Sequence, residues 1–194
     1  MGGLNNPSPQ VVPNTPTIPG LLAKYFSRTP GEYYGLLGAG YAVGVTTSVA
    51  DKLYSMPFLV LKTETFDRIA IMVDTAAAGN ARLGIYGDNN FAPGALVLDA
   101  GEVDTSTAGT KSITINQSLN PGLYWLTAIY NATPKVYAPL NVVNFLGIGS
   151  SSFITGQGNG NMYYTDQVYG ELPANHPTPT IGTVNCHSIT LRRA

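Results

Sequence analysis

The chain has 194 residues, of which 44% are hydrophobic and 11% are charged, and its formal net charge is -1. That length is sufficient for one domain with a substantial core, and the charge balance excludes the basic surface on which nucleic-acid binding depends. A single cysteine, Cys186, excludes an internal disulfide framework.

The first 20 residues contain five of the 14 prolines and no charged side chain. Proline lacks the backbone N–H that a regular ladder requires, so residues 1–20 are predicted to form an extended arm. A disordered tail is the alternative, and we favour an arm that docks on its own domain or on a partner. Residues 21–50 are predicted to be a Gly-rich connection between the arm and a β-sandwich domain at residues 51–194. The prolines assigned to the anchoring arm are Pro7, Pro9, Pro13, Pro16 and Pro19.

The longest uncharged apolar stretch, "GLLGAGYAVGVTTSVA", is too short and too rich in glycine to span a bilayer. The start of the chain also lacks the basic and apolar regions of a secretory signal. We therefore expect a soluble protein that is made in the cytoplasm and has no membrane partner.

Apolar residues alternate with polar ones in several short runs after residue 51, as in "FDRIAIMVDT". A period of two predicts strands with one buried face. Gly, Pro, Asn and Asp separate the runs, and no long amphipathic helix interrupts them. This pattern predicts an all-β fold, an antiparallel β-sandwich of jelly-roll type. The residues assigned to buried faces are Ile69, Ile71, Val73, Leu83, Ile85, Ile113, Ile115, Leu123, Trp125 and Ile129.

The loop "GDNNFAPG", residues 87–94, contains oxygen-bearing side chains of the kind that bind Ca²⁺. The alternating ligand positions and the distant Glu of an EF-hand loop are missing. Asp, Asn and Pro-Gly are also the residues that a bend between strands favours. We interpret the loop as a connection between two strands.

Candidate catalytic and metal-binding groups are few. The two histidines are His176, in a proline-rich loop, and His187, which follows Cys186. Neighbouring residues on a strand point to opposite faces, so Cys186 and His187 could not act together as nucleophile and base. One cysteine and two distant histidines also give no zinc-ligand spacing. We predict no catalytic residue, no metal and no cofactor.

Three carboxylates, Asp99, Glu102 and Asp104, lie close together in "LDAGEVDTS". Their spacing gives no information about the separation across a sugar ring on which a glycosidase depends. We interpret them as exposed charges on a turn.

Residues 147–179 are polar, aromatic and rich in glycine, and they predict a long surface loop. Loops of this length are uncommon unless they bind a ligand or pack against a neighbour. Tyr163, Tyr164 and Tyr169 are candidates for contacts with a glycan or between subunits. Packing of the loop on its own sheet is the alternative. A strand pattern resumes in "IGTVNCHSITLRR".

Several cues occur in a fixed order: Met-Pro-Phe in "LYSMPFLV", then "TAAAGNARLGIY", "PGALVLDAGEVDTSTAG" and "LNPGLYWL". Together they resemble a β-sandwich module of tailed-bacteriophage virion proteins, which is often found at the distal end of tail fibres. The resemblance covers residues 53–134. It implies a structural or adhesive role on a phage particle, with no catalytic residues.

The function expected from this resemblance is that of a non-enzymatic virion protein, assembled in the host cytoplasm. The arm would anchor it, and the sandwich would be displayed as a tail-fibre or receptor-binding tip or as a head decoration. Its expected partners are capsid or tail proteins, further copies of the chain in a homo-oligomer such as a trimer, and a host-surface glycan. The alternative is a carbohydrate-binding module or an accessory domain of a glycan-degrading enzyme, because jelly rolls with aromatic loops also bind sugars.

Overall fold

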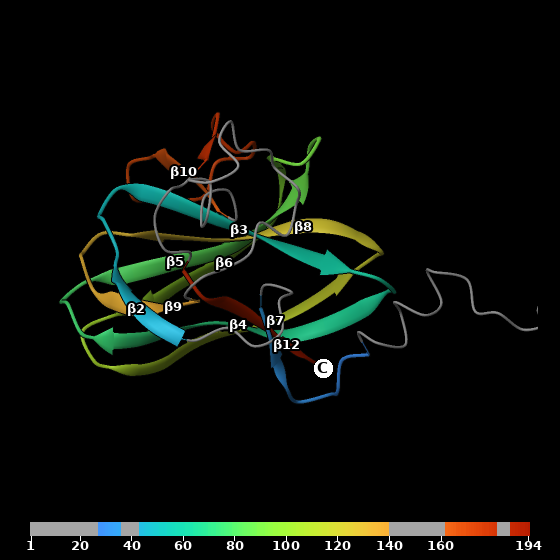
Figure 1. Ribbon diagram of the computed structural model, residues 1–194, viewed down its shortest axis with the longest axis horizontal. Helices are drawn as coiled ribbons and strands as arrows, with labels where there is room; N and C mark the ends of the chain where they lie inside the picture. Colours follow the sequence, from blue (N-terminus) through green and yellow to red (C-terminus); the bar gives the residue numbers. More distant parts are fainter. Residues whose placement is uncertain (1–26, 36–42, 140–161, 182–186) are drawn as a thin grey trace, which may run out of the picture.

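The computed structural model describes residues 27–35, 43–139, 162–181 and 187–194. Within these ranges the chain forms β-strands in two antiparallel sheets that pack face to face (Figure 1). The predicted all-β antiparallel sandwich is therefore confirmed. The predicted anchoring arm and its five prolines lie outside the described residues. The described part of the chain has no helix with the length and hydropathy needed to cross a membrane.

Sheet A has six strands and is organised around β4. One edge of β4 pairs with β7, and the other pairs with β12 and, further along, with β9. β1 then pairs with β12, and β2 pairs with β9. The strands of sheet A are β1 (Tyr33–Tyr34), β2 (Val43–Thr47), β4 (Glu64–Thr75), β7 (Gly109–Leu119), β9 (Lys135–Pro139) and β12 (Ile189–Arg193).

Sheet B also has six strands, in the order β11-β10-β3-β8-β5-β6. β3 and β8 pair along their whole lengths at its centre, and β10 extends the sheet beyond β3, above it in Figure 1. Its strands are β3 (Lys52–Val60), β5 (Asn80–Asp88), β6 (Pro93–Asp104), β8 (Gly122–Tyr130), β10 (Tyr163–Asp166) and β11 (Thr180–Ile181).

Two of these strands, β1 and β2, fall within residues 21–50, which the sequence predicts to be a connecting segment. Both pair with strands of sheet A through backbone hydrogen bonds. The sandwich therefore includes strands that precede residue 51. β10 similarly falls within the predicted loop at 147–179, where four residues pair with β3.

The core between the sheets includes the residues of β4, β5 and β7 that the sequence assigns to buried faces. Ile69, Ile71 and Val73 of β4 are buried there, and they meet Leu83 and Ile85 of β5. Ile113 and Ile115 of β7 are partly buried against the same core. These positions confirm the predicted strand alternation.

The loop at residues 89–92 connects β5 to β6, as the sequence predicts. Asn89 and Ala92 exchange backbone hydrogen bonds of 2.7 and 3.2 Å across the bend. Asn90 and Phe91 have positive φ values of 53° and 64°, a conformation that is costly for a bulky side chain. The Asp88 carboxylate offsets part of this cost by accepting a 3.1 Å hydrogen bond from the Phe91 backbone N–H.

Sheet B is buried on its outer face as well as on its inner face. Leu53, Tyr86, Trp125 and Ile129 form a second apolar cluster there, together with Leu172. Trp125 is thus buried on the same face as Ile129, as predicted, but it lies outside the space between the two sheets. Its indole Nε1–H donates a 2.9 Å hydrogen bond to the Asp88 carboxylate.

The second cluster is covered by residues 167–179, which we call the covering loop. Leu172 lies directly over Gly84 of β5, where a Cβ would collide with Leu172 Cδ1 and with the Leu98 carbonyl oxygen. The loop also pairs with the outer edge of β6: the Leu96 N–H donates to the Ala174 carbonyl at 2.9 Å, and the His176 N–H donates to the Gly94 carbonyl at 2.8 Å. The described part of the long loop therefore packs on its own sheet.

Removal of the Trp125 ring should destabilise the second cluster. We expect Trp125→Ala to lower the free energy of unfolding by about 3–5 kcal/mol, because it removes a fully buried aromatic side chain. Trp125→Phe should cost less, because it keeps a ring and loses chiefly the bond to Asp88. Urea unfolding of the parent and both variants measures the difference. An Ala variant as stable as the parent would contradict this assignment.

Candidate functional site

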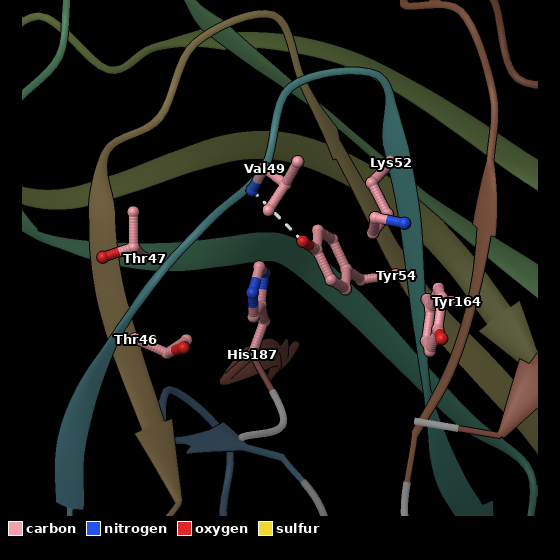
Figure 2. Close-up of a pocket in the computed structure, with 7 residues that line it drawn as sticks. All are labelled: Thr46, Thr47, Val49, Lys52, Tyr54, Tyr164 and His187. Carbon is pink, nitrogen blue, oxygen red and sulfur yellow. Dashed lines mark hydrogen bonds between the residues drawn. The ribbon is translucent and has the colours of Figure 1, made fainter. Parts of the chain in front are cut away.

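A cavity of about 250 Å³ lies at the side of the sandwich, between β2 of sheet A and β3 and β10 of sheet B. Figure 2 shows the residues of both sheets that surround it. The polar and aromatic groups gathered here make it the candidate functional site. Its lining residues are Thr46, Thr47, Val49, Lys52, Tyr54, Tyr164 and His187.

Tyr54 and His187 form the buried wall of the cavity. Their ring centroids are 3.9 Å apart with the planes tilted by 32°, and both residues are 2% exposed. The Tyr54 hydroxyl accepts a 3.1 Å hydrogen bond from the Val49 backbone N–H, drawn as a dashed line in Figure 2. Burial raises the pKa of Tyr54, so the phenol keeps its proton near neutral pH.

His187 is held within the wall as a neutral side chain. Its Nδ1 lies 3.3 Å from the Tyr130 hydroxyl, and the Tyr130 ring meets the imidazole edge to face. Burial lowers the pKa of His187 to about 3, because the cation would lose its hydration there. The neighbouring Cys186 lies outside the described residues. That its side chain and that of His187 point to opposite faces therefore stays a prediction.

The rim of the cavity carries a charged pair. The Lys52 Nζ lies 2.6 Å from the Asp166 carboxylate and 4.6 Å from the centre of the Tyr164 ring. The Asp166 side chain is 88% exposed, so the ion pair contributes little to stability and can rearrange at low cost.

The predicted contact tyrosines are separated by the fold. Tyr163 pairs with Ser55 and its ring lies against Trp125, with a centroid distance of 5.1 Å, on the outer face of sheet B. Tyr164, the next residue along β10, faces the opposite way and lines the cavity. Tyr169 packs against the second cluster from the covering loop. The three rings therefore do not form one stacking platform, and their contact with a glycan or subunit stays a prediction.

A second polar cluster joins sheet B to the covering loop. The Ser55 Oγ lies 2.9 Å from both the Thr127 hydroxyl and His176 Nε2. His176 Nδ1 lies 2.6 Å from the Pro177 carbonyl oxygen, which can only accept, so Nδ1 carries the proton and Nε2 accepts from Ser55.

This Ser–His pair has the spacing of a nucleophile and its base. Ser55 is fully buried within β3, however, and a nucleophile must contact its substrate. The pair therefore serves to fasten the covering loop to sheet B. The sequence gives no local signal for it, because the two residues are 121 positions apart.

The carboxylates of "LDAGEVDTS" lie on β6 and not on a turn. Glu102 and Asp104 are exposed, as expected. Asp99 is partly buried: both of its oxygens lie 2.9 Å from Arg82 Nε, and it accepts a 3.1 Å hydrogen bond from the Leu172 N–H. It thus attaches the covering loop to the sheet. In the described part of the chain, no three His, Cys, Asp or Glu side chains gather as a metal site requires.

Comparison of the chain with protein-family models, with curated proteins and with solved structures gave no match.

The buried histidines should make stability depend on pH. Burial lowers the pKa of both His176 and His187, so the unfolded chain binds more protons below its own histidine pKa of about 6.5. The stabilisation is complete above that pH and falls as the pH decreases toward about 3, the pKa of His187. Each histidine should contribute up to about 1.4 kcal/mol per pH unit.

The variant His187→Phe isolates one of these contributions, because phenylalanine keeps a ring against Tyr54 and does not titrate. We expect its unfolding free energy, measured in urea between neutral and acidic pH, to fall less steeply than that of the parent. Carboxylates titrate in both proteins and cancel in the comparison. Equal slopes for the two proteins would show that His187 is not buried as a neutral group.

Proposed function

We propose that the chain is a non-enzymatic structural protein of a bacteriophage particle, assembled in the host cytoplasm, that displays its sandwich at the particle surface. The observation that carries this proposal is the completeness of the segment that resembles virion modules. Residues 53–134 span β3 to β8 almost entirely, and these strands supply four members of sheet B and two of sheet A. Because this segment supplies strands to both sheets around one core, it has the composition of a structural module.

The attachment of the covering loop supports a display role. The loop is fixed by backbone bonds to β6, by the Asp99 carboxylate and by the Ser55–His176 pair. Such a loop stays in place over the sheet and braces it, which suits a protein that presents a constant surface.

The proposed anchor is the arm at residues 1–20, with other capsid or tail proteins as its partners. Arg28, close to the start of the described residues, is fixed to the sandwich. Its Nη1 lies 2.6 Å from the buried Glu64 carboxylate, and its Nη2 donates to the Leu59 carbonyl at 2.6 Å. A pull on the preceding chain would therefore be transmitted directly to sheet A.

Contacts between copies of the chain, in a trimer or another homo-oligomer, form part of the same proposal. β7 pairs with β4 along one edge, and no strand in the described ranges pairs with its other edge. An unpaired edge offers backbone donors and acceptors to a neighbouring subunit.

The carbohydrate-binding alternative is favoured by one observation, the cavity between β2, β3 and β10 with its two tyrosines and its charged rim. A sugar-binding module and a virion display protein share this feature. They differ in what the N-terminal arm does.

A particle-binding assay tests the proposal. Full-length protein should bind to phage particles that lack it, and a variant with the five arm prolines changed to glycine should bind much more weakly, because its arm loses the extended preference of proline. A variant with the same changes at Pro30 and Pro121, which are exposed and lie outside both the arm and the covering loop, is the control. Far-ultraviolet circular dichroism checks that all the proteins fold.

Two results would contradict the proposal. Equal binding by the arm variant and the parent would refute anchoring through the arm. Hydrolysis of a host polysaccharide by the pure protein would refute the non-enzymatic role.

A further inference from the structure

We propose that the cavity between β2, β3 and β10 binds one neutral pyranose unit, with its apolar face against Tyr164 and its hydroxyl groups toward Lys52, Tyr54 and Thr46. The role of this site in contact with a host glycan rests on the proposed function. Binding of the sugar by the pure chain does not.

The size of the cavity limits the occupant. Its volume of about 250 Å³ lies just below the range of about 300–1,000 Å³ typical of sites for drug-sized ligands. The space therefore suits one small ring, and a longer chain attached to that ring would extend past the rim.

One side of the cavity is aromatic. Tyr164 and Tyr54 are directly opposite each other on the paired strands β10 and β3, so their side chains lie on the same face of sheet B. Figure 2 shows both rings beside the cavity. The C–H groups on one face of a pyranose ring pack well against such a ring, and a tyrosine offers this surface at a low entropic cost.

A sugar also needs hydrogen-bond partners for its hydroxyl groups, and the rim of the cavity supplies them. The Lys52 ammonium donates and the Asp166 carboxylate accepts, and their charged atoms are 2.6 Å apart. Two adjacent sugar hydroxyls can use this pair at once, because each hydroxyl both donates and accepts. The Lys52 Nζ also lies over the Tyr164 ring, 4.6 Å from its centre, so the pair must open before a sugar stacks on that face. The exposed position of Asp166 allows this at low cost.

Further polar groups line the interior. The Tyr54 hydroxyl accepts its bond from the Val49 N–H, and its own proton remains available for donation into the cavity. Thr46 adds a hydroxyl group from β2, whereas Thr47, the next residue of the strand, faces the other way and is exposed. Each hydroxyl can turn to donate or accept, which suits a ligand made of hydroxyls.

The charges at the cavity favour a neutral sugar and disfavour an acidic one. Among the described lining residues, Lys52 is the cation, and it is already paired with a carboxylate. His187 is buried and carries no charge at neutral pH. An anionic sugar would meet Asp166 without gaining a free cation in exchange.

Nuclear magnetic resonance titration of the full chain, labelled with ¹⁵N, tests the proposal. The probes are glucose, galactose, mannose and N-acetylglucosamine, each as the free sugar and as its methyl glycoside, with glucuronic acid as the anionic comparison. We expect at least one neutral sugar to cause saturable shifts in the amide signals of Thr46, Lys52 and Tyr164. Binding of a methyl glycoside identifies the end unit of a glycan as the source, whereas binding of the free form alone identifies a soluble sugar.

Matched variants separate binding from folding. Tyr164→Ala should weaken binding by roughly tenfold, because it removes the stacking ring, and Thr46→Val should weaken it without a change of shape. Tyr33→Ala and Thr114→Val make the same changes at sites away from the cavity and should bind as the parent does. Thermal melting verifies that each variant is folded.

The proposal is overturned if no neutral sugar causes saturable shifts at the cavity, if glucuronic acid binds more tightly than every neutral sugar, or if Tyr164→Ala and Tyr33→Ala bind equally well. The titration contains no phage particle, so its failure is distinct from a failure of arm anchoring.

Discussion

Sheet B carries apolar side chains on both faces. Its inner face packs on sheet A, and the stability of the fold requires that its outer face is covered as well. Tyr54 and Phe58 point into the space between the sheets, whereas Leu53 and Trp125 point outward. An exposed cluster of that size would favour aggregation over folding. The covering loop removes it from water, so the sandwich is in effect three layers deep at this place.

The polar contacts of the covering loop determine where it lies. The Asp99 carboxylate accepts from the Leu172 N–H, and His176 bonds to Ser55 beneath it. Ser55 and His176 are buried and Asp99 is partly buried, so each would be costly without its partner, and alternative placements of the loop are disfavoured. The same segment continues from β10, which positions Tyr164 at the cavity. The candidate site therefore depends on the loop that covers sheet B.

Much of the fold could be predicted, because alternation in "FDRIAIMVDT" and the Asp-Asn-Pro-Gly bend are local signals. The same period of two places Tyr163 and Tyr164 on opposite faces. Burial of the outer face was also signalled, since "LYWLTAIY" is apolar at nearly every position, as in strands covered on both sides. The cavity and the Ser55–His176 bond could not be predicted, because they join residues distant in sequence.

The central claim is that the covering loop is held in place on sheet B. Hydrogen exchange of the amides that bond the loop to the sheet tests it most directly. The amides of Leu96, Leu172 and His176 each donate to a partner across the contact between the covering loop and sheet B. A loop that stays in place predicts slow exchange at all three, comparable to that of the paired amides of β3 and β8. Exchange of these three amides at the rate of an unstructured peptide, with β3 and β8 still protected, would contradict the account.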